Sequence, residues 1–399
     1  MKKRTRIISA MLAILMIACL LPVSAFAEGA PEKGTQLMQS KSLLTETKSI
    51  NDLIKGMDIN SVINLVGSLD IPTYIVYCKM SNQLPAANAE ITLTNQLNGE
   101  TKSFKANSFG IALIPKSLLS VYTVAATCNG PLTGLKYSTV PGQDLSVSAI
   151  PELDVLVLYP VLTVGLNYTD HYSYMIGYNN GTVRPNGLIT RGEAATMIFR
   201  LLDESTRSRI FTKSNSFSDV NGSCAHNNAI SSLAAAGIIK GYNDGTFRPY
   251  QTVTREQFAA MIGRMFSVEY TGKNWFGDIN GSFASGYINL LAFLGIMKGD
   301  GNGNVRPTAN ITRAEAATML NRLLGRLPAA DSSASCKGVK TWSDCPSTMW
   351  CYGDIMEATN SHNYTWALDT GNILNSDTMI CEAWTSLRTD TPNWSALQK

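Results

Sequence analysis

The feature that most constrains the fold is an internal repeat in the second half of this 399-residue chain. A nine-residue turn motif that ends in Arg-Pro occurs three times, beginning at Gly177, Gly241 and Gly299. A helix-start motif, Thr-Arg-x-(Glu/Gln), follows each turn, and both motifs recur at intervals of 64 and 58 residues. An aromatic-x-Asp motif comes after each unit and ends at Asp219, Asp278 and Asp344. Because three landmarks keep their order, we expect stacked copies of one structural unit.

Each unit carries local signals for a turn followed by a helix. Asn-Gly or Asp-Gly pairs supply the positive φ of a tight turn, and the Arg-Pro that follows delays any helix until after the proline. Capping boxes then begin a helix in every copy: Thr190 with Glu193, Thr254 with Gln257, and Thr312 with Glu315. Shorter helices are predicted at 228–236 and 286–294, each ended by a glycine. One helix pair cannot bury its own apolar face, so the units must pack together.

These motifs, in this order, resemble the S-layer homology family over residues 162–325, with a partial copy near 342–366. The resemblance implies repeats at 161–212, 213–272 and 273–328 that form a mainly α-helical pseudo-trimer. It also implies non-covalent binding of the secondary cell-wall polysaccharide of Gram-positive-type envelopes, often through pyruvylated sugars. The sequence departs from the family pattern at several positions and thereby predicts that some binding grooves are weak or silent: Ala225 and Phe283 for Trp, Asp300 for Tyr, and Gln257 for Glu.

Three arginines are the first candidates for binding, because Arg191, Arg255 and Arg313 follow the N-cap threonines. A cation here opposes the helix dipole at a cost of about 0.3 kcal/mol or more, so some partner must offset it. An anionic ligand at the free helix N–H groups is one explanation, which the resemblance favours; an ion pair with Asp219, Asp278 or Asp344 is the other. The candidate polysaccharide site comprises these arginines and aspartates, the turn glycines Gly177, Gly241 and Gly299, and the aromatic residues Tyr178, Tyr242, Phe283 and Trp350. The arginines that precede the turn prolines, Arg184, Arg248 and Arg306, are interpreted as structural.

The two ends of the repeat region are complementary. The first copy lacks the aromatic-x-Asp motif and the short helix that open the second and third copies. Residues 342–366 contain such an opening motif and helix, but no turn motif and long helix follow them. We hypothesise that the C-terminal segment, residues 329–399, closes the assembly by placing this helix where the first copy lacks one.

The N-terminus has the pattern of a secretory signal. Four basic residues precede an apolar run and the cleavage site Ala25-Phe26-Ala27, so residues 1–27 are expected to be removed. Lipoprotein cleavage at Cys19 is the alternative. Removal takes the net charge from +3 to −1, which argues against a nucleic-acid partner. No later stretch approaches the ~20 apolar residues of a membrane span. We therefore expect a secreted protein of the cell wall or cell surface, within an S-layer.

The segment between signal and repeats is predicted to be a helical linker at 28–69 and a strand-rich domain at 70–160. Seven short segments of alternating hydrophobicity, the sixth at 145–150, indicate a β-sandwich. Residues 84–93 and 107–111 loosely resemble the carboxypeptidase regulatory-like or transthyretin-like group. Cys78 and Cys128 could bridge two strands. The expected fold class is thus multidomain: an N-terminal β-sandwich, whose ligand no motif identifies, plus a helical pseudo-trimer.

Catalytic patterns are missing from the sequence. It has three histidines and contains no His-Glu-x-x-His zinc motif, nucleophile elbow or phosphate loop. Cys224 and His226 are interpreted as an ordinary surface pair. The sequence therefore predicts no enzyme, no cofactor and no metal, but a surface protein anchored by its repeats that displays the sandwich. Two alternatives stay open: an adhesin whose β-sandwich binds carbohydrate or protein, and a structural S-layer-associated protein.

Overall fold

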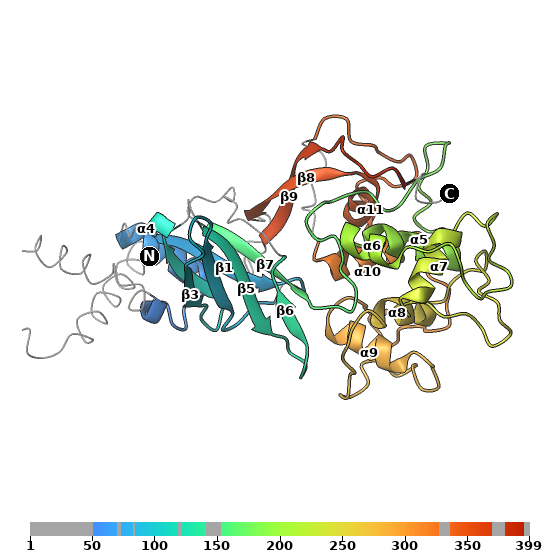
Figure 1. Ribbon diagram of the computed structural model, residues 1–399, viewed down its shortest axis with the longest axis horizontal. Coiled ribbons are helices and arrows are strands. Elements are labelled where there is room, and N and C mark those ends of the chain that lie inside the picture. Colours follow the sequence, from blue (N-terminus) through green and yellow to red (C-terminus); the bar gives the residue numbers. More distant parts are fainter. Residues whose placement is uncertain are drawn as a thin grey trace, which may run out of the picture.

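The computed structural model describes residues 51–69, 73–82, 84–118, 122–140, 153–326, 336–368 and 380–394. The expected signal sequence, the first part of the 28–69 segment and the expected strand at 145–150 lie outside these residues. Figure 1 shows a strand-rich part beside a helical part, with the hairpin of β8 (His362–Leu368) and β9 (Ile380–Leu387) lying over helix α11 (Tyr352–Thr359). No helix among the described residues is long and apolar enough to cross a membrane.

Seven strands of the N-terminal part form one hydrogen-bonded sheet in the order β3-β2-β5-β6-β7-β1-β4. Their bounds are Thr73–Met80 (β1), Glu90–Asn95 (β2), Thr101–Lys105 (β3), Ile111–Pro115 (β4), Tyr122–Asn129 (β5), Lys136–Ser138 (β6) and Leu153–Pro160 (β7). A sandwich of two separate sheets was expected, but the short β6 joins the halves through Tyr137 and Ser138, which pair with Pro160 and Tyr159. The described sixth strand is therefore Lys136–Ser138.

Strands β1, β4 and β7 of this sheet are apolar on both faces. Ala112 and Ile114 of β4 point into the core between the two halves, whereas Ile111 and Leu113 point to the opposite face. That outer face is covered by residues 51–58 and helix α4 (Ile59–Leu69), which lies within the segment expected to be helical. Because both faces are covered, the alternating pattern of a half-exposed strand is missing here. Cys78 and Cys128 are free thiols, so the structure does not contain the bridge considered for them.

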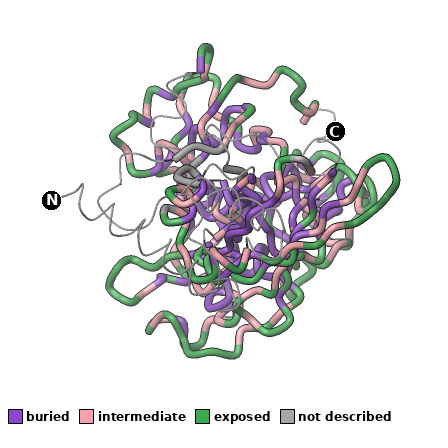
Figure 2. The backbone as a smooth tube through the Cα atoms, turned by 90° about the vertical axis from the view of Figure 1, so that its left-hand side faces the viewer, coloured by how far each residue is buried: buried purple, intermediate pink, exposed green. Residues whose placement is uncertain are grey.

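The repeat region is helical, as the capping motifs predicted. The long helices are α5 (Arg191–Leu201), α8 (Arg255–Gly263) and α10 (Arg313–Leu324), and each begins with a complete capping box. The short helices α7 (Asn227–Ala235) and α9 (Ser285–Phe293) are followed by Gly237 and Gly295 with φ of 73° and 74°, and α6 (Glu204–Ile210) follows α5. Buried residues gather in the interior of the molecule, while the outer loops are mostly exposed (Figure 2).

The three long helices meet at a closed ring of backbone hydrogen bonds. The N–H of Ile189 donates to the carbonyl of Ile311 (3.3 Å), that of Ile311 to Val253 (3.0 Å), and that of Val253 to Ile189 (3.1 Å). All three side chains are fully buried. Each residue stands two positions before its helix start, so the ring fixes the three starts around one approximate three-fold axis.

The C-terminal segment packs against the first repeat. Helix α11 lies on α10, as α7 lies on α5 and α9 on α8. Asp344 accepts hydrogen bonds from the N–H groups of Val183 and Arg184, both at 2.8 Å. The Trp342 ring lies against Gly177. These contacts occupy the place that the second and third repeats fill with their own opening segments.

Candidate functional site

Three equivalent junctions surround the three-fold axis, and each combines residues from two repeats. A junction contains the arginine at the start of one long helix, the turn of the next copy and the third residue of that copy's helix. Junction 1 joins Arg191, turn 241–249 and Gln257; junction 2 joins Arg255, turn 299–307 and Glu315; junction 3 joins Arg313, turn 177–185 and Glu193. The repeat order closes into a circle because junction 3 links the last helix to the first turn.

The helix-start arginines are buried and hold the neighbouring turn. In junction 2, Nε of Arg255 donates to the Val305 carbonyl at 2.7 Å and Nη2 to the Lys298 carbonyl at 3.1 Å. Junctions 1 and 3 repeat both bonds, from Arg191 to Phe247 and Lys240 and from Arg313 to Val183 and Ile176. Carbonyl acceptors thus offset the unfavourable position of each cation at a helix start.

The N–H groups at the helix starts are also occupied. The first two N–H groups of α8, from Arg255 and Glu256, donate to the carbonyls of Ala309 and Pro307, both at 2.9 Å. Helices α5 and α10 make the same pair of bonds with the turns that face them. The prediction that free N–H groups form an anion site was therefore wrong for these positions, because the adjacent turn already satisfies them.

The third guanidinium nitrogen distinguishes the junctions. Nη1 of Arg255 lies 2.8 Å from Glu315 Oε1, and Nη1 of Arg313 lies 3.9 Å from Glu193 Oε1. In junction 1 the acid is replaced by Gln257, whose Nε2 donates to the Tyr242 hydroxyl at 3.2 Å. Junction 1 therefore has one carboxylate fewer than the other two.

The aspartates of the aromatic-x-Asp motif cap the turns. Both oxygens of Asp219 accept backbone N–H groups, from Phe247 and Arg248, at 2.7 Å. Asp278 accepts the N–H groups of Val305 and Arg306 in the same way. Asp344 accepts those of Val183 and Arg184, in the turn of the first copy. Among the described residues, none of these aspartates forms an ion pair with a helix-start arginine. The alternative of a structural Arg–Asp pair is thus corrected to a carboxylate that caps a turn.

The other candidate residues fall into two groups. Gly177, Gly241 and Gly299 touch the aromatic rings of Trp342, Phe217 and Phe276, so each glycine lets a ring approach the backbone. Tyr178 and Tyr242 are half-buried and lie under Arg184 and Arg248, whose guanidinium carbons are 3.9 and 4.0 Å from the ring centres. Phe283 and Trp350 are exposed, by 62% and 66%.

Junction 2 contains an open pocket. The pocket has a volume of about 180 Å³ and is lined by Arg255, Lys298, Gly299, Arg306, Glu315, Thr318, Met319, Arg322 and Trp350. Asp300 stands where the other turns have a tyrosine, so Arg306 lacks the ring that lies under Arg184 and Arg248 at this position of the turn. Four cationic side chains thus face one carboxylate, beside the exposed ring of Trp350.

The candidate binding residues drawn from the sequence do not include three of the pocket cations. Lys298 and Arg322 belong to none of the three motifs, and Arg306 was interpreted as structural. A signal was present, because Arg200, Arg264 and Arg322 recur at the same intervals of 64 and 58 residues as the motifs.

Burial lowers the pKa of the Arg322 guanidinium, and the Asp354 carboxylate opposes that shift. Arg306 has a left-handed φ of 53°, a strained conformation shared by Arg184 and Arg248.

Comparison with known proteins finds three matching segments within the repeat region. Residues 172–195, 216–259 and 276–317 match the family model of the S-layer homology domain. These three segments are S-layer homology repeats. The resemblance predicted from the sequence is therefore confirmed for the repeat region.

Several curated proteins are similar to this chain. It is 30% identical over 210 residues to cell surface glycoprotein 1 of Acetivibrio thermocellus, covering 49% of this chain and 9% of that protein. It is 33% identical over 203 residues to the cellulosome-anchoring protein of the same organism, covering 49% and 44%. An amylopullulanase of Thermoanaerobacterium thermosulfurigenes is 35% identical over 157 residues, covering 37% and 8%. The chain thus spans less than half the length of each of these relatives.

Proposed function

We propose that this chain is a non-catalytic protein held at the cell surface by its S-layer homology repeats, which bind an anionic secondary cell-wall polysaccharide. The repeats, at 161–212, 213–272 and 273–328 with the closing segment 329–399, would form the anchor. The strand-rich part at 70–160, a β-sandwich folded from one continuous sheet, would be displayed. The observation that carries the proposal is the pocket of junction 2, which is lined by four cationic side chains, Arg255, Lys298, Arg306 and Arg322, and by one carboxylate, Glu315.

The chemistry of this pocket suits an acidic sugar. Guanidinium groups bind carboxylates through short, charge-assisted hydrogen bonds, and both Arg306 and Lys298 are exposed enough to reach a ligand. Trp350 offers an exposed aromatic face at the mouth of the same pocket, against which a sugar ring can pack. A carboxylate-bearing sugar such as a pyruvylated residue would use both features at once.

The names of the relatives support the same function. One is a cellulosome-anchoring protein and another a cell surface glycoprotein, and the similarity to each covers about half of this chain. Since the repeats are what the family model matches, attachment is the function that these relatives suggest for this region. The exported state and the cell-wall location are part of the proposal.

The test is co-sedimentation of the purified protein with cell-wall sacculi, either native or stripped of secondary polysaccharide by acid. We expect sedimentation with native walls only. Replacing Arg306→Gln removes an exposed pocket cation and should weaken binding by about 10-fold, or ~1.4 kcal/mol. Arg209→Gln is the matched control, because Arg209 is an exposed arginine of α6 outside the three junctions.

Other outcomes would redirect or reject the proposal. Equal sedimentation with native and stripped walls would make peptidoglycan the ligand. Binding to neither would reject the anchoring function and make the strand-rich part the functional module. Equal binding by the Arg306 and Arg209 variants would exclude the pocket of junction 2 as a binding site.

A further inference from the structure

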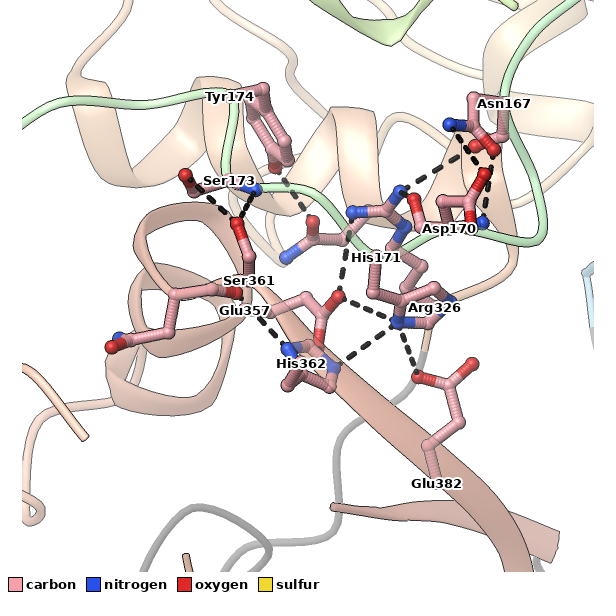
Figure 3. Close-up of polar contacts among 12 residues, drawn as sticks. Asn167, Asp170, His171, Ser173, Tyr174, Arg326, Glu357, Ser361, His362 and Glu382 are labelled. Atoms are coloured by element: carbon pink, nitrogen blue, oxygen red, sulfur yellow. Dashed lines mark hydrogen bonds and ion pairs between the residues drawn. The ribbon is translucent and has the colours of Figure 1, made fainter. Parts of the chain in front are cut away.

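A cluster of buried ionisable side chains lies where the C-terminal segment meets the loop before the first repeat (Figure 3). We call His171, Glu357 and His362 the His–Glu centre; their side chains are exposed by 1%, 0% and 0%. His171 lies in the loop between β7 and α5, Glu357 on α11, and His362 at the start of β8. The junctions described above do not use any of these residues.

The potential ligand atoms of the centre lie close together. His171 Nδ1 lies 3.2 Å from His362 Nε2 and 3.0 Å from Glu357 Oε1. The other oxygen, Glu357 Oε2, lies 3.1 Å from His362 Nε2, and one ligand atom from each residue can be chosen so that all three lie within 4.8 Å of one another. Zinc bound tetrahedrally at 2.0–2.1 Å would hold its ligand atoms about 3.3 Å apart, which is close to the distance between the two nitrogens and to that between each nitrogen and its nearer carboxylate oxygen.

The hydrogen-bonding pattern leaves one carboxylate oxygen of the centre without a donor. His362 Nδ1 lies 3.0 Å from the Asn360 carbonyl, which can only accept, so Nδ1 carries the proton. In the neutral ring, Nε2 therefore carries a lone pair and lies 3.2 Å from His171 Nδ1. Glu357 Oε2, 3.1 Å from the same Nε2, accepts no hydrogen bond from any described residue. Two acceptors this close in a buried site favour a positive species beside them.

The surroundings hold the ligands in place. The Tyr364 ring stacks on His171 with centroids 4.1 Å apart, and Trp384 stacks on His362 at 3.8 Å. Arg326 Nη1 lies 3.5 Å from Glu357 Oε1. Partners of this kind fix the orientation of metal-binding side chains. Glu382 Oε2, 3.7 Å from His171 Nδ1, lies near enough to provide a fourth ligand.

We propose that His171, His362 and Glu357, with Glu382 as the fourth ligand, bind a divalent metal ion of the zinc class as a closed structural site. His–His–carboxylate sets bind zinc, and a fourth protein ligand in a fully buried site leaves no position open for a substrate. The ion would join three segments, since residue 171 is 186 positions before Glu357 on α11. It would therefore lock the C-terminal helix and hairpin onto the start of the repeat region.

The test uses the full mature chain, produced without a histidine tag, because a tag would bind zinc itself. Metal content is measured by mass spectrometry after dialysis, and thermal unfolding is recorded with chelator and with added zinc. We expect one zinc ion per chain, a higher unfolding temperature with zinc than with chelator, and a tetrahedral Co²⁺ absorption spectrum after exchange.

Glu357→Gln and His362→Gln should abolish zinc retention and the effect of zinc on unfolding. His226→Gln is the matched control, because His226 is the only other histidine of the chain and contacts Thr196 instead. A folded wild-type chain that retains no zinc and unfolds equally with chelator and zinc would overturn the proposal. The positive species would then be a proton shared within the His–Glu centre. This measurement does not depend on wall binding, so the two proposals can fail separately.

Discussion

At the scale of single residues, the recurring turn glycine meets a packing requirement. A Cβ atom on Gly241 would lie 2.4 Å from the Phe217 ring and 2.6 Å from the Thr246 carbonyl oxygen. Neither neighbour can withdraw easily, because one belongs to the backbone of the turn and the ring packs against the core. The same contact recurs with Trp342 at Gly177 and with Phe276 at Gly299.

We therefore expect Gly241→Ala to lower the free energy of unfolding by about 1–3 kcal/mol, the usual range for overpacking. Urea denaturation followed by circular dichroism measures this change. Gly222→Ala is the control, because no atom lies within 4 Å of its Cβ position and it should change stability by less than about 0.5 kcal/mol. Equal stability of the two variants would show that the ring and turn can separate without cost.

At the scale of helices and strands, local signals could be predicted and long-range partners could not. The capping boxes at Thr190, Thr254 and Thr312 involve residues three apart, so the sequence alone places them. The partners of Arg255 and Asp219 lie in turns about 28 to 50 residues away, and no local pattern names them. For the same reason the sequence does not predict that β6 pairs with β7 and connects the two halves of the sheet, or that His171 contacts Glu357.

The C-terminal helix provides the sharpest test at this scale. Deleting residues 340–399 removes Asp344, which caps the first turn, and Trp342, which is buried against Gly177. It also exposes the face of α10 on which α11 packs. Since the repeats share one core, we expect the whole repeat region to unfold cooperatively at a lower temperature. Differential scanning calorimetry gives the result, and an unchanged transition would contradict the closing role of this segment.

At the scale of the whole molecule, the three junctions surround one axis, and the proposed ligand is a repeating polymer. The backbone ring of Ile189, Val253 and Ile311 holds their spacing fixed, so one polymer chain can engage more than one junction. The junctions are not identical: junction 2 has Asp300 in place of the tyrosine, and junction 1 has Gln257 in place of the acid. Multivalent attachment can still raise apparent affinity by about 100-fold or more over a single site.

We therefore expect intact polysaccharide to bind at least about 100-fold more tightly than a fragment of one repeating unit. Trp350→Ala, which removes the exposed ring of junction 2, should nearly abolish binding of the fragment but reduce binding of the polymer only in part. Isothermal titration calorimetry with both ligands compares the two losses. Trp275→Ala is the control, because that tryptophan is also exposed and does not line the pocket. Equal losses for fragment and polymer would mean that junction 2 acts alone and that the three-fold arrangement serves only to build the fold.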